Sequence, residues 1–219
     1  MNSLFSIPLA YLLGSIPSGL LVVKVATGKD VRKIESGRTG GTNAMRAAGP
    51  LAGLFTAVLD ISQGAAAIWL GRNVFSSPDW LVALNGLLAI IGHNYSAFLL
   101  ARGEDGKLRF RGGAGGATTL GVAIGLWVNS WLVILPIAGL VYLLVGYASI
   151  TTISIALSTM GIFTVKAIQG VSPWIYAALG AAAVAVVVIA LRPNLERLKE
   201  GTERRVNLLA RIFTPSKFK

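Results

Sequence analysis

Long apolar runs recur along this chain and limit its fold more than any other feature of the sequence. The clearest runs cover residues 3–23, 51–70, 81–100 and 174–191. A helix of about 20 predominantly apolar residues crosses a bilayer core about 30 Å thick. The sequence therefore predicts an all-α integral membrane protein and not a water-soluble globule.

A still longer apolar stretch covers residues 114–165. It is interrupted at Asn129-Ser130 and again in the Ser/Thr-rich segment 147–154, so we expect three shorter helices there. The prediction is seven transmembrane helices in one domain, residues 1–205, with five helices as the alternative. The first run lacks the basic start and small-residue exit of a cleaved signal peptide, so we count it among the seven.

Composition supports the membrane assignment and excludes other classes. The chain has 219 residues, of which 54% are apolar and only 13% charged, and its formal net charge is +11. Strong positive charge alone is typical of nucleic-acid-binding proteins, but those proteins are basic without being half apolar. We therefore expect no nucleic-acid partner. Because the sequence contains no cysteine, disulfides, cysteine nucleophiles and Cys-based metal sites are excluded.

Most basic residues lie in segments that we expect on one face of the membrane. Of the 20 Lys and Arg, 17 fall in residues 28–46, in residues 102–111 and after Leu191. Positive charge near helix ends stays cytoplasmic, so seven helices predict an outside N-terminus and a cytoplasmic C-terminus. The five Trp fall at or near the opposite helix ends, where indole rings favour the membrane interface. Residues 206–219 mix apolar and basic side chains, which predicts an amphipathic tail on the inner leaflet.

The first basic segment, residues 35–46, reads ESGRTGGTNAMR. Three glycines in five residues let backbone N–H groups converge on an anion, and Arg46 adds a planar fork of donors. The alternative is a flexible loop in which Arg38 and Arg46 contact anionic lipid headgroups.

The second basic segment, residues 109–119, reads RFRGGAGGATT and has four glycines in five residues just before a predicted helix. A glycine-rich turn that leads into a helix N-terminus is suited to binding an anion. The alternative is close packing between membrane helices, where small residues are common.

Two further residues stand out within or beside the apolar runs. His93 is the only histidine, and with no second His or Cys nearby we expect a hydrogen-bonded structural group and no metal site. Asp60 lies inside the second run. An acid within a membrane helix is by default a candidate for function, and structural pairing with a neighbouring Arg is the alternative.

Taken in order, these segments resemble the bacterial PlsY family of membrane acyltransferases, which move an acyl chain from acyl phosphate to glycerol-3-phosphate. Order and spacing hold over roughly residues 8–205. The matching pieces are YLLGSIPSG at 11–19, Ser36-Gly37, Gly40, Thr42-Asn43-x-x-Arg46, Leu59-Asp60, Gly64, Gly92-His93-x-Tyr95, Gly112-Gly113-x-Gly115, Ala117-Thr118, Tyr147-x-Ser149, Arg192-x-Asn194-x-x-Arg197 and Gly201-x-Glu203.

The resemblance implies a seven-helix fold with its site at the cytoplasmic face, and no metal, cofactor or covalent acyl-enzyme. The 1-hydroxyl of glycerol-3-phosphate would attack the acyl-phosphate carbonyl directly and give lysophosphatidic acid for phospholipid synthesis. We expect a monomer in the bacterial inner membrane whose partners are the two substrates and membrane lipids.

The resemblance also implies roles for individual residues. Catalytic roles fall to Ser36, Arg46, His93 and Asn194. Substrate binding is expected of Gly37, Arg38, Gly40, Thr42, Asn43, Arg111, Gly112, Gly113, Gly115, Ser149 and Arg197. Structural roles are expected of Asp60 and Glu203.

Several positions depart from the family pattern. The usual Lys-Gly-Gly-Lys-Gly reads Arg-Gly-Gly-Ala-Gly at 111–115, and the Lys expected after Leu-Asp is Gln63. The expected His is Leu191, the expected Asn is Arg38, and residues 103–109 are an insertion. Either Arg38, Lys107 or Arg109 replaces the lost charge, or the substrate is another polyol phosphate, or activity is absent.

A rival interpretation is a transporter or a lipid-binding membrane protein. Transporters are commonly built from internal repeats with ionisable groups near mid-membrane. The sequence has no such repeat, and its unusual residues gather near one face.

Overall fold

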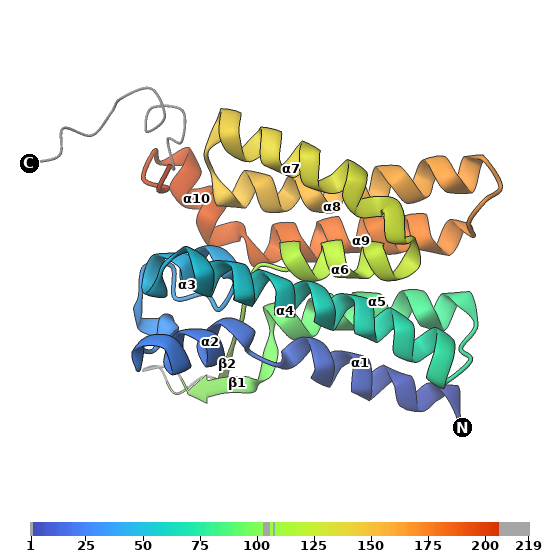
Figure 1. The fold of residues 1–219 in the computed structure, drawn as a ribbon, viewed down its shortest axis with the longest axis horizontal. Helices are drawn as coiled ribbons and strands as arrows, with labels where there is room; N and C mark the ends of the chain where they lie inside the picture. Colours follow the sequence, from blue (N-terminus) through green and yellow to red (C-terminus); the bar gives the residue numbers. More distant parts are fainter. Residues whose placement is uncertain (1, 103–105, 107, 206–219) are drawn as a thin grey trace, which may run out of the picture.

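The computed structural model describes residues 2–102, 106 and 108–205, which form mostly helices (Figure 1). In chain order the elements are η1 (Ser3–Phe5), α1 (Ser6–Ser15), α2 (Ser18–Thr27), η2 (Val31–Lys33), α3 (Gly41–Ala48), α4 (Pro50–Trp69), η3 (Leu70–Val74), α5 (Asp79–Asn94), β1 (Ser96–Arg102), β2 (Leu108–Arg111), α6 (Gly116–Leu126), η4 (Val128–Ser130), α7 (Trp131–Val145), α8 (Ala148–Ile168), α9 (Trp174–Ala190) and α10 (Arg192–Lys199).

Prolines and a glycine set several helix ends. Pro17 lies between α1 and α2, where a residue without an N–H interrupts the helical hydrogen bonds. Pro78 and Pro173 occupy the positions just before α5 and α9. Gly146 ends α7 in the left-handed conformation, with φ of 78°, which a residue without Cβ adopts readily. The local sequence thus accounts for these boundaries.

Four helical segments in the described part of the chain are long and apolar enough to cross a membrane. They are Ser3–Thr27, Pro50–Val74, Val128–Val145 and Ala148–Ile168. A fifth is obtained if α9 and α10, which are bent by 61°, count as one span. The apolar helix α6 is shorter, with 11 residues. Length and composition therefore support a multi-pass membrane protein without establishing the seven spans expected from the sequence.

The prediction of one helix through residues 81–100 is wrong, and so is a strictly all-α fold. Helix α5 ends earlier, and the chain continues as β1, which pairs antiparallel with β2 in a hairpin that joins Ser96 to Arg111. The cause is tertiary. The Ser96 hydroxyl donates to the Ser15 carbonyl, and the Ala97 N–H donates to the Ser15 hydroxyl at 3.4 Å. These bonds hold the chain extended directly after α5.

The stretch 114–165 forms three helices, α6, α7 and α8, as predicted. The second break, however, lies at Gly146-Tyr147, and the Ser/Thr-rich residues that follow belong to α8. The hydroxyls of Thr151 and Thr152 donate to backbone carbonyls four residues earlier, at 3.1 and 2.9 Å. Because the helix itself satisfies these hydroxyls, they do not interrupt it.

Glycines allow α4 and α6 to approach closely. A Cβ on Gly64 would lie 2.2 Å from the Thr118 carbonyl oxygen, and one on Gly121 would lie 1.9 Å from the Ile61 carbonyl oxygen. Close packing of small residues is a usual basis of helix association in membranes. Helix α1 packs similarly on α5, and α8 packs on α9.

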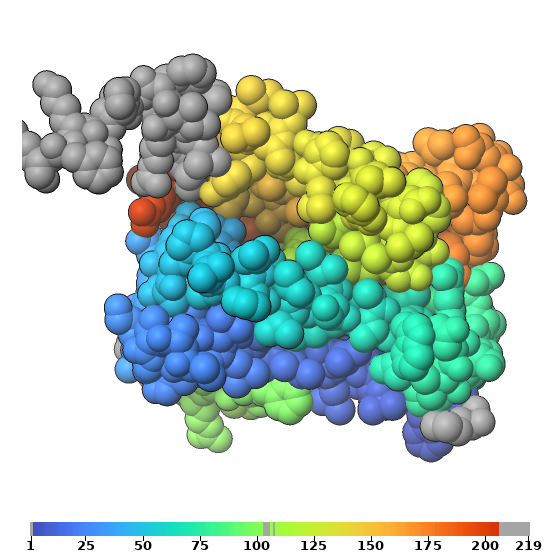
Figure 2. Space-filling view, viewed as in Figure 1, coloured from blue at the N-terminus to red at the C-terminus, as the bar shows by residue number. Residues whose placement is uncertain are grey.

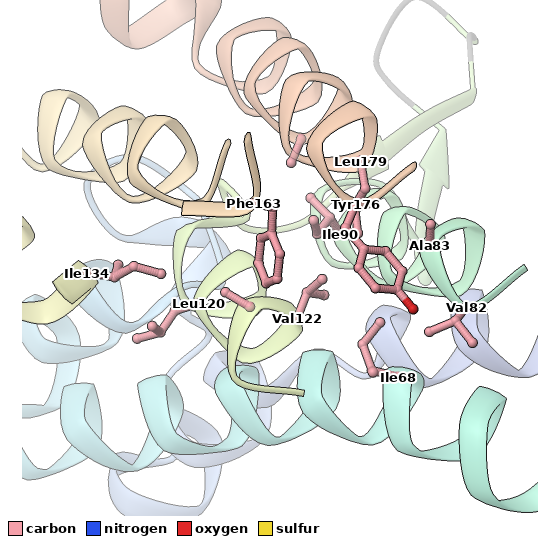
Figure 3. Packing of buried hydrophobic residues seen from close by; sticks show 12 residues of the cluster. Ile68, Val82, Ala83, Ile90, Leu120, Val122, Ile134, Phe163, Tyr176 and Leu179 are labelled. Carbon is pink, nitrogen blue, oxygen red and sulfur yellow. The ribbon is translucent and has the colours of Figure 1, made fainter. Parts of the chain in front are cut away.

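The main hydrophobic core joins α4 through α9 (Figure 3). At its centre the rings of Phe163 and Tyr176 meet edge to face, with centroids 6.1 Å apart and planes at 78°. Ile68, Ile90 and Leu120 pack around them. This core fixes the relative positions of the helices that carry the candidate site.

The three basic segments gather at one end of the bundle, which we call the basic end. Figure 1 places α2, α3, the β1–β2 hairpin, the α7–α8 connection and α10 at this end, and the α4–α5 and α8–α9 connections at the other. The amphipathic tail predicted for residues 206–219 lies outside the described residues, as does part of the insertion at 103–109.

Candidate functional site

A cavity of about 750 Å³ opens at the basic end. Figure 2 shows the hollow between α7 and the neighbouring α3 and α4. Of the residues predicted from the sequence, it is lined by Ser36, Arg38, Gly40, Thr42, Asn43, Arg46, Asp60, His93, Gly115, Ser149, Asn194, Arg197 and Glu203. Four others do not line it: Gly37, Arg111, Gly112 and Gly113. Arg111 lies in β2 and is exposed.

The first segment forms a loop that is closed by Asn43. The Asn43 amide donates to the backbone carbonyls of Val31, Ile34 and Arg38, at 3.1, 2.9 and 2.9 Å. Its Oδ1 is buried with no hydrogen-bond partner among the described residues. The amide nitrogen of Asn43 therefore holds the loop that presents Ser36 and Arg38 to the cavity.

Arg38 connects this loop to two other segments. Its Nη1 donates to the Gly113 carbonyl at 2.9 Å, its Nε donates to Asn194 Oδ1 at 3.3 Å, and its Nη2 donates to the Ala190 carbonyl. Burial lowers the pKa of the Arg38 guanidinium below its ordinary value, and the charge of Arg197 lowers it further. One side chain thus ties the first loop to the second loop and to the end of α9.

Glu203 extends the same network. It accepts hydrogen bonds from Ser149 Oγ at 2.8 Å and from Asn194 Nδ2 at 2.9 Å. Ser149 begins α8 and Asn194 lies in α10. The chain of contacts from Ser149 through Glu203 and Asn194 to Arg38 therefore connects segments that are far apart in the sequence, and it forms one wall of the cavity.

Two other arginines line the cavity and have no partner among the described residues. Arg46 lies in the last turn of α3, and Arg197 lies in α10. Within residues 2–102, 106 and 108–205, neither guanidinium makes a hydrogen bond or an ion pair. A guanidinium offers five N–H donors in a fork that matches carboxylate and phosphate. These two side chains are therefore available to an anionic ligand.

The second loop packs directly on His93. The Gly113 N–H donates to the His93 carbonyl at 2.8 Å, and a Cβ on Gly113 would lie 1.9 Å from His93 Nε2. The Thr39 N–H donates to the Gly112 carbonyl at 3.2 Å. Glycine is thus required at position 113 by the close approach of the imidazole, and backbone hydrogen bonds join the two loops.

The N-terminus of α6 faces the cavity. Ala114, Gly115 and Gly116 line it, and in the described structure their N–H groups make no backbone hydrogen bond. No side chain of a described residue caps this helix. Unpaired N–H groups and the positive end of the helix dipole favour an anion at such a position. The anion site expected for the segment stays a prediction, and the N–H of Gly113 is not available to it because it donates to the His93 carbonyl.

Asp60 and His93 form a buried pair beside the cavity. Asp60 Oδ1 lies 3.7 Å from His93 Nδ1, which is longer than a hydrogen bond. Neither carboxylate oxygen has a hydrogen-bond partner in the part of the chain described, and no arginine there pairs with Asp60. Among those same residues, the pair is not joined by a third His, Cys, Asp or Glu in a group that could hold a metal ion.

Sequence reasoning missed the apolar half of the cavity and part of its polar wall. Leu120, Leu135 and Ile155 continue the cavity between α6, α7 and α8, and Thr151 and Thr152 line it from α8. The hydroxyl-rich run at 147–154 was the available signal for the threonines. The apolar residues had no signal, because every helix of this chain is apolar.

The chain is similar to known proteins over most of its length. A family model described as glycerol-3-phosphate acyltransferase matches residues 4–201. A glycerol-3-phosphate acyltransferase of Thermus thermophilus is 37% identical over 204 residues, which cover 93% of this chain and 95% of the relative. Glycerol-3-phosphate acyltransferase 1 of Deinococcus radiodurans is 36% identical over 211 residues, covering 94% and 96%.

Solved structures give the same result. A crystal structure of PlsY (YgiH), an integral membrane glycerol 3-phosphate acyltransferase in its glycerol 3-phosphate form, superposes with a TM-score of 0.80 at 30% identity and covers 97% of this chain and 99% of that one. The lysophosphatidic acid form of PlsY gives a TM-score of 0.77 at 29% identity. The chain therefore belongs to the glycerol-3-phosphate acyltransferase family.

Proposed function

We propose that this family member transfers a fatty acyl group from acyl phosphate to the 1-hydroxyl of glycerol-3-phosphate, with lysophosphatidic acid and inorganic phosphate as products. One observation carries the proposal: a single cavity joins cations that have no partner in the described part of the chain to an apolar surface. A phosphate group and an acyl chain need these two environments at adjacent positions. A solvated basic loop would not provide the second of them.

The polar half of the cavity provides for two anionic substrates. No described residue pairs with the guanidinium groups of Arg46 and Arg197, and the N-terminus of α6 adds backbone donors. Two phosphate groups repel each other in water, so a site that holds both must offset their charge. Holding the two substrates side by side also lowers the barrier of their bimolecular reaction, by roughly several kcal/mol.

Gln63 and Ala114 stand where the family pattern has lysines, and we assign Arg38 to supply the positive charge that is missing there. Arg38 lines the cavity, and its Nη1 binds the Gly113 carbonyl next to Ala114. The two alternatives are less well supported. Arg109 does not line the cavity, and Lys107 lies outside the described residues. Three of the five donors of Arg38 are used inside the protein, which leaves two for a substrate phosphate.

The chemical step is a direct displacement. The 1-hydroxyl oxygen forms a bond to the acyl carbonyl carbon, the bond from that carbon to the phosphate oxygen breaks, and the hydroxyl proton leaves with the phosphate. Donors aimed at the phosphate stabilise the charge that develops as it departs. We assign Arg46 and the α6 N-terminus to this charge, and Ser36, His93 and Asn194 to orienting the reacting groups.

The apolar half is suited to the acyl chain. It is formed by α6, α7 and α8, and Leu135 and Gly139 are exposed on its α7 side. The charged side chains of the lining lie in the polar half of the cavity, near the loops. An acyl phosphate held with its chain between these helices would therefore have its carbonyl group beside the arginines.

We propose that the chain is a multi-pass protein of the bacterial inner membrane. We propose seven crossings, made by α1 with α2 and by α4, α5, α6, α7, α8 and α9, because successive helices run to opposite ends of the bundle (Figure 1). The positive charge of the basic end favours the cytoplasmic side, which puts the cavity at the cytoplasmic face.

A direct assay tests the proposal. Purified protein in detergent is given acyl phosphate and glycerol-3-phosphate, and the release of inorganic phosphate is followed together with the formation of lysophosphatidic acid. We expect both products in equal amounts. Acyl-coenzyme A in place of acyl phosphate is the donor control, and another polyol phosphate in place of glycerol-3-phosphate is the acceptor control.

Each outcome decides between alternatives. Turnover with another polyol phosphate alone would identify a paralogue with a different acceptor. Lysophosphatidic acid formed equally well from acyl-coenzyme A would contradict the proposed donor. No turnover with any pair, in protein shown to be folded by its thermal unfolding transition, would favour a lipid-binding or transport protein.

A further inference from the structure

A second cavity, of about 350 Å³, lies at the end of the bundle opposite the basic end. It is formed where η3, the start of α5, the end of α6, the last turn of α8 and the start of α9 meet. Its polar lining consists of Arg72, Asp79, Trp127, Lys166, Ser172 and Tyr176. The acyltransferase site does not use any of these residues.

One part of this cavity is internally satisfied. Arg72 Nη1 donates to the last carbonyls of α6, those of Gly125 and Leu126, at 3.1 and 3.3 Å, and its Nη2 donates to the Tyr176 hydroxyl at 3.1 Å. The Tyr176 hydroxyl in turn donates to Asp79. These contacts tie α6, α9 and the start of α5 together, and Oδ1 of Asp79 accepts one of them.

Lys166 has no negative partner in the part of the chain that the structure describes. Its ammonium lies 4.3 Å from the centroid of the Trp127 ring, and no carboxylate of the described residues lies within 4.0 Å of it. The hydroxyl oxygen of Ser172 is buried and has no hydrogen-bond partner there. With Arg72 and Lys166 against Asp79, the cavity has an excess of one positive charge and an unused hydroxyl donor.

The rim of the cavity is apolar and exposed. Val171 lines it and is 64% exposed, and the nearby Ile168 and Trp174 are 70% and 62% exposed. In a membrane protein, such side chains at a helix end contact lipid, and indole rings favour the interface. A ligand for this position therefore has a negative headgroup and an apolar body.

We propose that this cavity binds the phosphate of an anionic phospholipid, with Lys166 and Ser172 as its contacts and Arg72 as a supporting charge. The single negative charge of a phosphate diester balances the one excess positive charge of the cavity. Arg72 and Lys166 are the basic residues that the sequence places away from the basic end, and both line this one cavity. Basic pockets between membrane helices are a known means of binding lipid headgroups.

The test titrates the purified full chain, in a neutral detergent, with phosphatidylglycerol and counts bound lipid by native mass spectrometry. Near a membrane surface one Lys contributes about 1 kcal/mol to binding of anionic lipid, or about fivefold in affinity. We expect Lys166→Gln to lose about this much at the tightest site and Lys166→Arg to retain it. Lys29→Gln, which removes an exposed charge outside this cavity, should bind as the unmodified protein does.

Two further titrations identify the ligand. Phosphatidylcholine should bind more weakly than phosphatidylglycerol to the unmodified protein, and inorganic phosphate should not displace phosphatidylglycerol. Equal affinity of Lys166→Gln and the unmodified protein for phosphatidylglycerol would overturn the proposal. Equal binding of the two lipids would overturn the preference for an anion, and displacement by inorganic phosphate would show that the ligand is not a lipid. Unchanged acyltransferase activity of Lys166→Gln would show that the variant is folded.

Discussion

Arg46 and Arg38 line the same cavity but differ in their contacts, and this difference predicts opposite consequences of removing them. Arg46 has no hydrogen bond or ion pair with any other described residue, whereas Arg38 makes three hydrogen bonds within the protein. Arg46→Ala therefore removes an interaction that exists only when an anionic substrate is bound. We expect the variant to fold as the unmodified protein does and to lose most of its activity.

The magnitude follows from the number of contacts. A hydrogen bond to a charged group contributes about 1.5–3 kcal/mol, and a guanidinium that binds phosphate through two donors makes two of them. The lower limit for Arg46→Ala is therefore about 3 kcal/mol in transition-state stabilisation, or about a 150-fold fall in kcat/KM. Stability should change by less than about 0.5 kcal/mol, as is usual for a side chain without partners.

The assay is phosphate release from acyl phosphate with glycerol-3-phosphate varied, and the unfolding midpoint is measured in the same detergent. Arg102→Ala is the matched control, because Arg102 is exposed and does not line the cavity. It should leave kcat/KM within about twofold of the unmodified value, since charges away from a site have small effects. The reasoning is refuted if Arg46→Ala retains a third or more of the activity, or if Arg102→Ala loses as much as Arg46→Ala.

Three further variants test other parts of the site. Arg38→Ala should lower the free energy of unfolding by about 4.5 kcal/mol, at about 1.5 kcal/mol for each of three hydrogen bonds donated by a charged group. An unchanged unfolding midpoint would show that these bonds are not important. Gly113→Ala should lower kcat by at least about tenfold, because its Cβ would lie 1.9 Å from His93 Nε2 and displace the imidazole or the loop. A Cβ on Gly161 meets nothing within 4 Å, so Gly161→Ala should remain active. Gly139→Leu adds a side chain at the apolar wall where Cβ has open space, so turnover of long acyl phosphates should fall more than turnover of short ones, and an equal fall for both would argue against an acyl site there.

The sequence predicted the helices well where prolines, glycines and apolar runs coincide. Helices α4 and α9 begin and end within a residue or so of the predicted runs, and residues 114–165 divide into three helices. It failed at residues 96–102, where β1 replaces the predicted end of a helix. Nothing local marks that change, because the extended conformation depends on hydrogen bonds to Ser15 and on pairing with β2.

The sequence placed the three basic segments on one face, and the family pattern assigned their residues to one site, but the contacts between the segments were not predictable. Arg38 binds atoms of Ala190 and Asn194, more than 150 residues away along the chain. The family pattern indicated that Arg38 stands at an unusual position, but only its surroundings suggest that it serves as the second cation. The apolar half of the cavity depends on which faces of α6, α7 and α8 meet, and uniformly apolar helices do not encode this locally.

The sequence by itself determined the class of the protein, the family it resembles, and the segments that carry charge and glycine, because hydropathy, charge and motif spacing are properties of the linear chain. The tertiary structure decided which of those residues share a cavity, which arginines are free, and where the hairpin replaces a helix. The physical reason is that hydrogen bonds and close packing act over a few ångströms between residues far apart in sequence, such as Arg38 with Ala190 and Gly113 with His93.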